Sequence, residues 1–149
     1  MKLLLKGGTV VSAAGSRVAD VLVDGEKIAA VGEGLEAGGA KVVDVSGKLL
    51  FPGFIDAHTH FDLDVCNTTT ADNFDTGTRS ALRGGTTMVV DFACPNKGET
   101  LQYGLDLWHK KADGRSSCDY SFHMTIDDWN ETIKSEIPKM FEQGVSSFK

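Results

Sequence analysis

The sequence lacks the features that would mark a secreted, membrane-spanning or nucleic-acid-binding protein. Its three cysteines are an odd number without a CxxC pair, so we expect no disulfide and a reduced, cytoplasmic setting. Only three apolar residues separate Lys2 from Lys6, too few for a signal-peptide core, and no later stretch approaches a membrane span. Basic residues number 15 against 21 acidic ones, which argues against nucleic acid or an anionic membrane as partner.

The chain also shows no internal repeat or low-complexity segment, and it is short. It has 149 residues, whereas a complete eight-stranded β/α barrel needs roughly 250. The chain by itself is therefore not a whole barrel.

Residues 1–50 are predicted to form a small β-sheet domain. Asp24 and Gly25 stand between two β-rich runs, where their tolerance of positive φ favours a tight hairpin turn. We expect short strands at residues 3–11, 18–24, 27–32, 40–44 and 48–50.

Residues 51–149 alternate between strand and helix patterns, which is typical of βαβ units around a parallel sheet, so the fold class is α/β. We expect strands at residues 54–60, 86–93, 120–126 and 145–149, one helix that ends at residue 83, and two more at 99–112 and 129–143.

Helix ends give three further predictions. Thr70 or Asp72 can cap the first helix. Gly84 suits the left-handed position that follows it. Pro138 should kink or split the last helix near Glu136.

Two histidines end the first predicted strand of this region, in the run F-P-G-F-I-D-A-H-T-H at residues 51–60. Side chains two apart on a strand share a face about 7 Å apart, so His58 and His60 could converge on one metal ion. Any two histidines with this spacing share a face, so the pattern also fits an accidental pair. Asp56 lies on the same face and could either orient a histidine or serve as a structural carboxylate.

Three other residues are weaker candidates on pattern alone. Lys149 ends the run V-S-S-F-K at the height of the histidines if successive strands are in register, but an exposed strand end commonly carries a lysine. Asp91 lies in the apolar run M-V-V-D-F-A and needs a partner if it is buried, which favours a supporting role over a ligand role. His123 could line a barrel centre, although a hydrogen-bonded core histidine is the more frequent case.

Three segments of the chain resemble the cyclic amidohydrolases, most closely the D-hydantoinase and dihydropyrimidinase branch. They are G-K-L-L-F-P-G-F-I-D-A-H-T-H (47–60), R-G-G-T-T-M-V-V-D-F (83–92) and G-V-S-S-F-K (144–149). The resemblance implies a TIM (β/α)8 barrel of the metal-dependent amidohydrolase type. Residues 51–149 would be its first half, ending within strand 4, and residues 1–50 part of the small β-sheet domain before it.

The same resemblance implies a centre of two divalent metal ions, with zinc expected. His58 and His60 would bind the more buried ion, and Lys149, carboxylated by CO2, would bridge the two. A metal-bridged hydroxide would then hydrolyse the cyclic amide of hydantoins or 5,6-dihydropyrimidines to N-carbamoyl amino acids. The general base and the remaining ligands are expected beyond residue 149, and the assembly is expected to be a homo-oligomer, a tetramer in particular.

Residues after the histidine pair bear on the substrate. By resemblance, Asp62 stands where dihydroorotases carry an arginine and allantoinases an asparagine. An acidic residue cannot bind a substrate carboxylate, which favours uncharged cyclic diamides. The loop that follows resembles the stereochemistry gate of the family, so Phe61, Leu63 and Val65 are expected to contact the group at the ring carbon, with Asp56 and Asp91 as supports of the metal ligands.

Other functions remain open at this point. One is a non-catalytic dihydropyrimidinase-like assembly protein, against which the presence of His58, His60 and Lys149 speaks. A second is another cyclic amidohydrolase, such as an allantoinase. A third is a small independent α/β protein, which would leave a strand edge and an apolar face uncovered.

Overall fold

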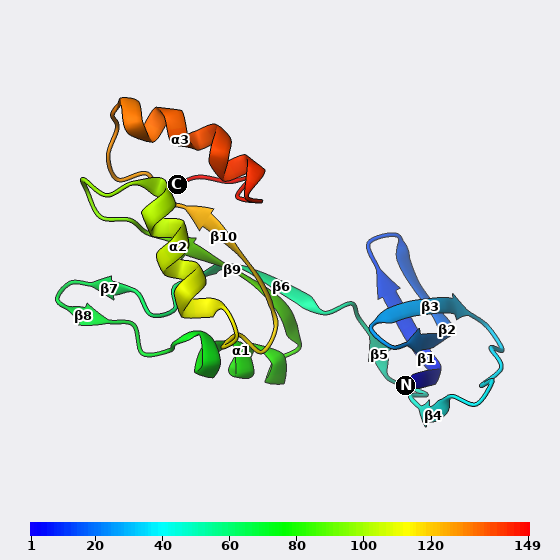
Figure 1. The fold of residues 1–149 in the computed structure, drawn as a ribbon. Helices are drawn as coiled ribbons and strands as arrows, with labels where there is room; N and C mark the ends of the chain where they lie inside the picture. The colour runs from blue at the N-terminus through cyan, green and yellow to red at the C-terminus, as the bar shows by residue number, and fades with distance from the viewer. The chain divides into compact units, whose positions relative to one another are not determined.

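The computed structural model describes residues 1–149, which form two compact units, Met1–Pro52 (unit 1) and Gly53–Lys149 (unit 2). Each unit has its own main sheet, with five strands in unit 1 and three in unit 2. Figure 1 shows unit 1 as strands alone, coloured blue to cyan, whereas all three helices belong to unit 2.

Unit 1 consists of a single sheet. Its strands are β1 (Lys2–Ser12), β2 (Gly15–Asp24), β3 (Lys27–Gly32), β4 (Lys41–Asp44) and β5 (Leu49–Leu50). The order is β3-β2-β1-β4, with β5 also paired to β1. Strands β1, β2 and β3 pair antiparallel, whereas β4 and β5 run parallel to β1. The five predicted strands are confirmed, and so is the turn at Gly25, whose φ is +63°.

A buried carboxylate ties the middle of this sheet to a loop. Asp20 is only 5 % exposed and accepts hydrogen bonds from the backbone N–H groups of Gly7, at 2.9 Å, and Leu35, at 3.0 Å. Gly7 has φ +75° and interrupts the register between β1 and β2, so its N–H needs a partner outside the strand ladder. Asp20 supplies that partner.

Unit 2 alternates strands and helices around a parallel sheet of order β10-β9-β6. Its elements are β6 (Phe54–Thr59), β7 (Asp64–Val65), β8 (Thr68–Thr69), α1 (Phe74–Arg83), β9 (Thr86–Ala93), α2 (Leu101–Ala112), β10 (Asp119–Met124) and α3 (Glu131–Glu142). The predicted fourth strand is reduced to one parallel bridge, between Phe148 and Met124. No helix of the chain combines the length and apolarity that crossing a membrane requires.

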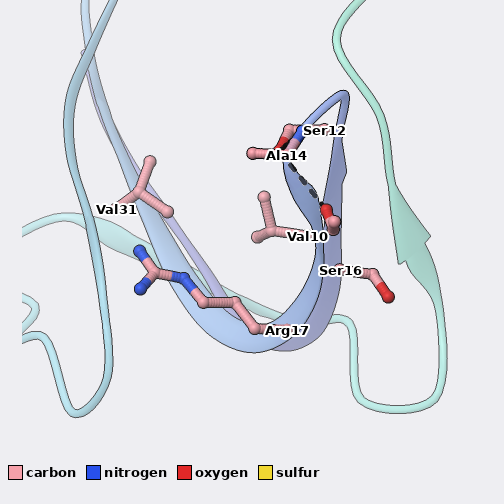
Figure 2. A pocket seen from close by; sticks show the side chains of 7 residues that line it. Val10, Ser12, Ala14, Ser16, Arg17 and Val31 are labelled. Carbon is pink, nitrogen blue, oxygen red and sulfur yellow. Dashed lines mark hydrogen bonds between the residues drawn. The ribbon is translucent and has the colours of Figure 1, made fainter.

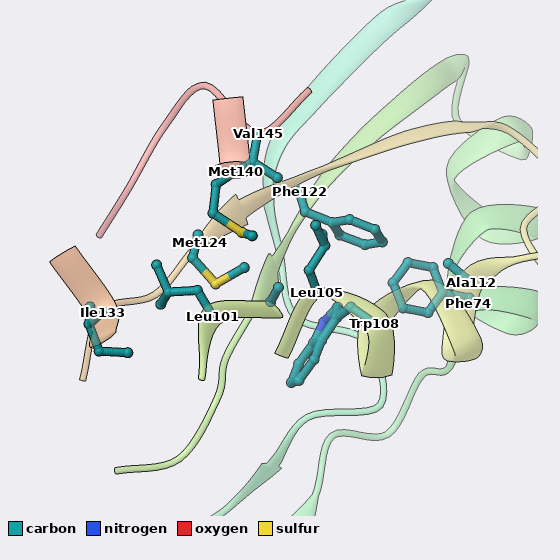
Figure 3. Packing of buried hydrophobic residues seen from close by; sticks show 11 residues of the cluster. Phe74, Leu101, Leu105, Trp108, Ala112, Phe122, Met124, Ile133, Met140 and Val145 are labelled. Atoms are coloured by element: carbon teal, nitrogen blue, oxygen red, sulfur yellow. The ribbon is translucent and has the colours of Figure 1, made fainter. Parts of the chain in front are cut away.

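The hydrophobic core of unit 2 lies between the sheet and its helices. Figure 3 shows Ile133 at one end of this cluster, Phe74 and Ala112 at the other, and Leu105 and Trp108 between them. Phe122 and Met124 reach this core from β10, two residues apart, as the period of a strand requires. The residues that alternate with them point to the opposite face of the sheet.

The structure corrects two predictions about the ends of α1. The N-cap is Asn73, whose side chain accepts the N–H of Thr76 at 2.9 Å in a capping box, and not Thr70 or Asp72. The left-handed residue after the helix is Gly85, with φ +90°, because Gly84 at φ −84° continues the helical turn.

The prediction that Pro138 kinks or splits α3 is wrong on the second count, because α3 runs unbroken from Glu131 to Glu142. Proline removes one backbone hydrogen bond, but buried side chains hold the helix on both sides of it. Ile133 and Met140 pack in the core. Glu136 accepts the N–H of Leu101, the first residue of α2, at 2.7 Å.

Candidate metal centre

Four nitrogen-bearing side chains meet at the carboxyl ends of the parallel strands, around the ring of Phe92 on β9. The Phe92 centroid lies 4.7 Å from that of His58 and 4.9 Å from that of His60. It lies 4.7 Å from the centroid of His123, on β10, and 4.6 Å from Nζ of Lys149. Phe92 is only 6 % exposed. One phenyl ring thus sits at the centre of the predicted site.

Strand alternation explains why this cluster faces away from the helices. Asp91 bonds to Trp108 of α2 on the helix side of the sheet, so the next residue, Phe92, points to the other side. His123 is the register partner of Phe92 and lies between two core residues of β10. Phe92 and His123 are therefore adjacent on the face opposite the helices.

His58 and His60 lie close together on this face. Their ring centroids are 5.1 Å apart in an edge-to-face arrangement. Nδ1 of His60 is buried without a hydrogen-bond partner. Burial lowers the pKa of His60, and the charges of His58 and Lys149 lower it further, while Asp91 opposes the shift. A neutral imidazole with an unused ring nitrogen is the form that binds a metal ion, so His60 fits a ligand role.

Lys149 is held at the same end of the sheet by its backbone. Its N–H donates to the carbonyl of Met124 and its carbonyl accepts from the N–H of Ile126, both at 2.9 Å. Its ammonium stands over the Phe92 ring in a cation–π arrangement. An ammonium has no lone pair for a metal, so Lys149 can contribute only after it loses a proton.

Asp91 braces the strand end that carries the histidines. It is fully buried, and its Oδ2 accepts from the hydroxyl of Thr59 at 2.8 Å and the N–H of Phe61 at 2.9 Å, the residues on either side of His60. Its Oδ1 accepts from Nε1 of Trp108 at 2.9 Å. Burial raises the pKa of Asp91, although these hydrogen bonds act in the opposite direction. The Asp91 side chain thus lies on the helix side of the sheet and holds the backbone on both sides of His60.

The remaining candidates from the sequence lie in different surroundings. Oδ1 of Asp56 accepts the backbone N–H of His58 at 3.1 Å. Phe61 packs on Phe74, with ring centroids 5.4 Å apart, and Leu63 packs against the same core. Val65 is 46 % exposed. Of the three predicted gate residues, Val65 is the one open to solvent.

Val65 belongs to the short hairpin of β7 and β8. Cys66 and Asn67 form its turn, with φ of 51° and 60°. Positive φ at both central residues is characteristic of a type I′ turn, which matches the twist of a hairpin. The three cysteines of the chain, Cys66 among them, are free.

Nowhere does the chain bring together three His, Cys, Asp or Glu side chains in a group that could hold a metal ion. A centre built on His58 and His60 therefore needs further ligands. A hollow of about 520 Å³ lies elsewhere, in unit 1. Figure 2 shows it between the β1–β2 hairpin and Val31, with Arg17 at its side. Arg17 is its only charged residue, and its lining includes no His, Cys, Asp or Glu.

Sequence reasoning missed two parts of this site. It did not assign Phe92 a role, although the alternation that buries Asp91 also turns Phe92 toward the histidines. It also did not identify Thr59 and Trp108 as partners of Asp91, and no local pattern indicates that pairing, since Trp108 lies on a different element.

Comparisons with known proteins agree with this architecture. The sequence profile of the amidohydrolase family matches residues 49–117. The chain is 43 % identical over its whole length to a D-hydantoinase of Geobacillus stearothermophilus, of which it covers 32 %. It is 44 % identical to a dihydropyrimidinase of Dictyostelium discoideum over 99 % of the chain and 30 % of that protein. The crystal structure of a dihydropyrimidinase from Brevibacillus agri superposes with a TM-score of 0.96 at 44 % identity, over 99 % of the chain and 32 % of that structure.

These similarities show that the chain has an α/β fold of the kind found in amidohydrolases. More narrowly, the relatives that it resembles over nearly its whole length are named D-hydantoinase and dihydropyrimidinase. It spans about a third of the length of the relatives it matches.

Proposed function

We propose that the protein hydrolyses the cyclic amide bond of hydantoins and 5,6-dihydropyrimidines to N-carbamoyl amino acids. The observation that carries this proposal is the convergence of His58, His60 and Lys149 on Phe92 at one end of a parallel sheet. The names of the relatives, D-hydantoinase and dihydropyrimidinase, support the same substrate class.

The residues of this chain would serve a centre of two divalent metal ions, with zinc the expected metal. His58 and His60 would hold one ion. The neutral amine of Lys149 would add CO2, forming an N–C bond and releasing a proton, and the resulting carbamate would bridge both ions. When bound, such ions polarise an amide carbonyl and lower the pKa of water from about 15.7 toward neutrality.

We also propose that unit 2 is the first half of a TIM barrel and that unit 1 is part of the small β-sheet domain before it. The parallel order of β6, β9 and β10, in chain sequence, supports this fold, as does the bridge that adds residue 148 beside β10. In such barrels, active sites lie at the carboxyl ends of the strands, where the histidine pair and Lys149 lie here. By the same family likeness, the protein would be a cytoplasmic homotetramer.

Activity assays test the proposal directly. Purified protein is incubated with hydantoin and with dihydrouracil, and N-carbamoyl product is measured before chelation, after chelation and after zinc is restored. We expect hydrolysis that chelation abolishes and zinc restores. No product from either substrate, with zinc bound, would leave the non-catalytic assembly role as the better account.

Asp62 bears on the choice among cyclic amides. It has φ +50°, and its Oδ2 is buried without a hydrogen-bond partner. Its backbone carbonyl accepts from Nζ of Lys111 at 2.5 Å, which fixes the loop just after His60. A carboxylate at this position repels an anionic substrate, which favours uncharged hydantoins and dihydropyrimidines over dihydroorotate.

The β7–β8 hairpin is our candidate for the gate that sorts substrates by the group at the ring carbon. Val65 is its exposed apolar side chain, whereas Leu63 and Phe61 fix the base of the loop through the core. We expect Val65→Ala to change the ranking of bulky against small 5-substituted hydantoins, measured as kcat/KM ratios. The matched substitution Val42→Ala, half-exposed in unit 1, should leave the ranking unchanged, and an unchanged ranking in Val65→Ala would remove the hairpin from consideration.

A further inference from the structure

His123 makes two hydrogen bonds that span the candidate site. Its Nε2 lies 2.9 Å from the carbonyl oxygen of Ala57, and its Nδ1 bonds to the hydroxyl of Ser147. A carbonyl only accepts hydrogen bonds, so Nε2 carries the hydrogen. In the neutral ring, Nδ1 then accepts from the Ser147 hydroxyl. Both ring nitrogens are thus engaged, and neither has a free lone pair for a metal ion.

The two partners of His123 flank the proposed metal ligands. Ala57 directly precedes His58, and Ser147 stands two residues before Lys149. Strands β6 and β10 are not neighbours, because β9 lies between them. His123 therefore reaches across the Phe92 ring, on which its own ring packs at 4.7 Å, and connects the first strand of the sheet to the segment beside β10.

The hydrogen bond to Ala57 lies at an interruption in the pairing of the sheet. The pairing of β6 with β9 loses its register between Asp56 and Thr59, so Ala57 and His58 have no ladder partner there. The N–H of the same peptide group, that of His58, donates to Oδ1 of Asp56 at 3.1 Å, whereas the Ala57 carbonyl, which lies outside the ladder, needs a partner of its own. The imidazole of His123 supplies the missing partner.

We propose that His123 is a positioning residue, which sets the backbone of His58 and the segment leading to Lys149 at a fixed separation across Phe92. This inference rests on the proposed metal centre and adds to it a residue that does not bind metal. Partners that orient metal ligands typically contribute about 10- to 100-fold in metal affinity. An ordinary core histidine would contribute to folding stability only.

Zinc binding to the purified protein tests the proposal without relying on activity. Four variants are compared with the parent protein. His123→Leu removes both hydrogen bonds, His123→Gln keeps an amide N–H at the place of Nε2, and Ser147→Ala removes the donor to Nδ1. Ser146→Ala is the matched control, because Ser146 is the exposed neighbour of Ser147. Zinc content at saturation, the dissociation constant for Zn²⁺, and thermal unfolding of the zinc-free proteins are measured.

We expect the zinc content at saturation to be the same in all five proteins. Affinity should fall about 10- to 100-fold in His123→Leu and by less in Ser147→Ala, with partial rescue in His123→Gln and no change in Ser146→Ala. Equal affinity in parent protein, His123→Gln and Ser147→Ala would overturn the positioning role, even if His123→Leu fails to fold. A lost ion in His123→Leu would make His123 a ligand and overturn it as well. If the parent protein binds no zinc, the proposed metal centre itself is wrong. That result differs from the two outcomes that overturn only the positioning role of His123.

Discussion

At the scale of single residues, the Asp91 carboxylate helps to hold the site in place although it lies on the other side of the sheet from the histidine rings. It is fully buried on the helix side of the sheet, and its two oxygens accept from a hydroxyl, an indole and two backbone N–H groups. Four donors compensate much of the cost of burying the charge. Two of these donors, Thr59 and Phe61, flank His60, so Asp91 helps to hold the backbone on both sides of that residue.

Replacing Asp91 with asparagine should therefore destabilise the fold. The amide group of Asp91→Asn would turn an N–H2 toward two donors, leaving them unpaired, and we expect a loss of about 2–4 kcal/mol in the free energy of unfolding. Denaturant unfolding followed by tryptophan fluorescence measures this loss. Thr59→Val, which removes one of these hydrogen bonds, should cost about 1 kcal/mol. A loss in Asp91→Asn no greater than that in Thr59→Val would contradict the bracing role.

Tyr120 links stability to alkaline pH. Burial raises the pKa of Tyr120 to about 12, and the hydrogen bond to Asp113 and the charge of that carboxylate act in the same direction. The folded-state pKa of Tyr120 lies above the reference value of 10.0. The contribution of the Tyr120 phenol to the free energy of unfolding is therefore complete below about pH 10 and is lost as the pH rises toward 12.

Tyr120→Phe should flatten the decline in stability above pH 10. Denaturant unfolding at several pH values between 8 and 11 measures the slope, and absorbance near 295 nm follows the phenol itself. Tyr103→Phe is the control, because Tyr103 is 51 % exposed and lies on the surface of α2. If stability falls as steeply with pH in Tyr120→Phe as in the parent protein, other groups cause the loss of stability at alkaline pH.

At the scale of elements, α1 and the loop after β6 share one close contact. Gly77 on α1 leaves room for the ring of Phe61, and a Cβ there would lie 2.3 Å from Phe61 Cε1. The ring packs in turn on Phe74 of the same helix. Because Phe61 directly follows His60, this contact helps to fix the direction in which the chain leaves the site.

Gly77→Ala is expected to lower stability although alanine is the better helix former. Helix propensity favours alanine by about 1 kcal/mol, whereas overpacking against Phe61 costs about 1–3 kcal/mol, so the net effect is a loss. Ser80→Ala, at an exposed position of the same helix, should give a small gain. Thermal or denaturant unfolding measures these changes. In a double mutant with Phe61→Leu, part of the stability lost in Gly77→Ala should be recovered. If the stability losses of the two single mutants simply add in the double mutant, the Phe61 ring is not the cause of the loss.

At the scale of the whole molecule, the proposed metal centre joins strands that are distant in sequence, from His58 on β6 to Lys149 beside β10. A ligand that binds the folded state alone stabilises it by mass action, by about 2.7 kcal/mol at 100 times its dissociation constant. Metal binding should therefore appear as a change in global stability as well as in activity.

Zinc should raise the melting temperature of the protein, and chelation should reverse the rise. His58→Ala and His60→Ala should lose this shift, because each removes a proposed ligand. His109→Ala is the matched control, because His109 lies on α2 and bonds to Asp113 at 3.1 Å. Differential scanning calorimetry with and without zinc makes the comparison. A shift that survives in His60→Ala, or vanishes in His109→Ala, would place the metal elsewhere.

Local patterns predicted most of the elements but few of the contacts between them. Period-2 alternation in β10 and the strand–helix alternation of unit 2 follow from which side chains must be buried, and that information is local. The last residue of α1, Arg83, was predicted correctly, but the N-cap was expected at Thr70 or Asp72 and is Asn73, and the left-handed glycine was expected at Gly84 and is Gly85, because neighbouring residues are equally suitable for these positions. Pro138 was expected to kink or split α3, and the helix is not split, because tertiary burial of Ile133 and Met140 outweighs that local preference.

The sequence by itself determined the strand that carries His58 and His60, the shared face of the pair, and the resemblance that makes Lys149 a candidate ligand. Only the tertiary structure decided that Phe92 lies at the centre of the cluster and that His123 connects Ala57 to Ser147. The physical reason is the separation in sequence of the residues that interact. Alternation and capping act over a few residues, whereas the His123 contacts span 66 and 24 positions and exist only once parallel strands have set their register.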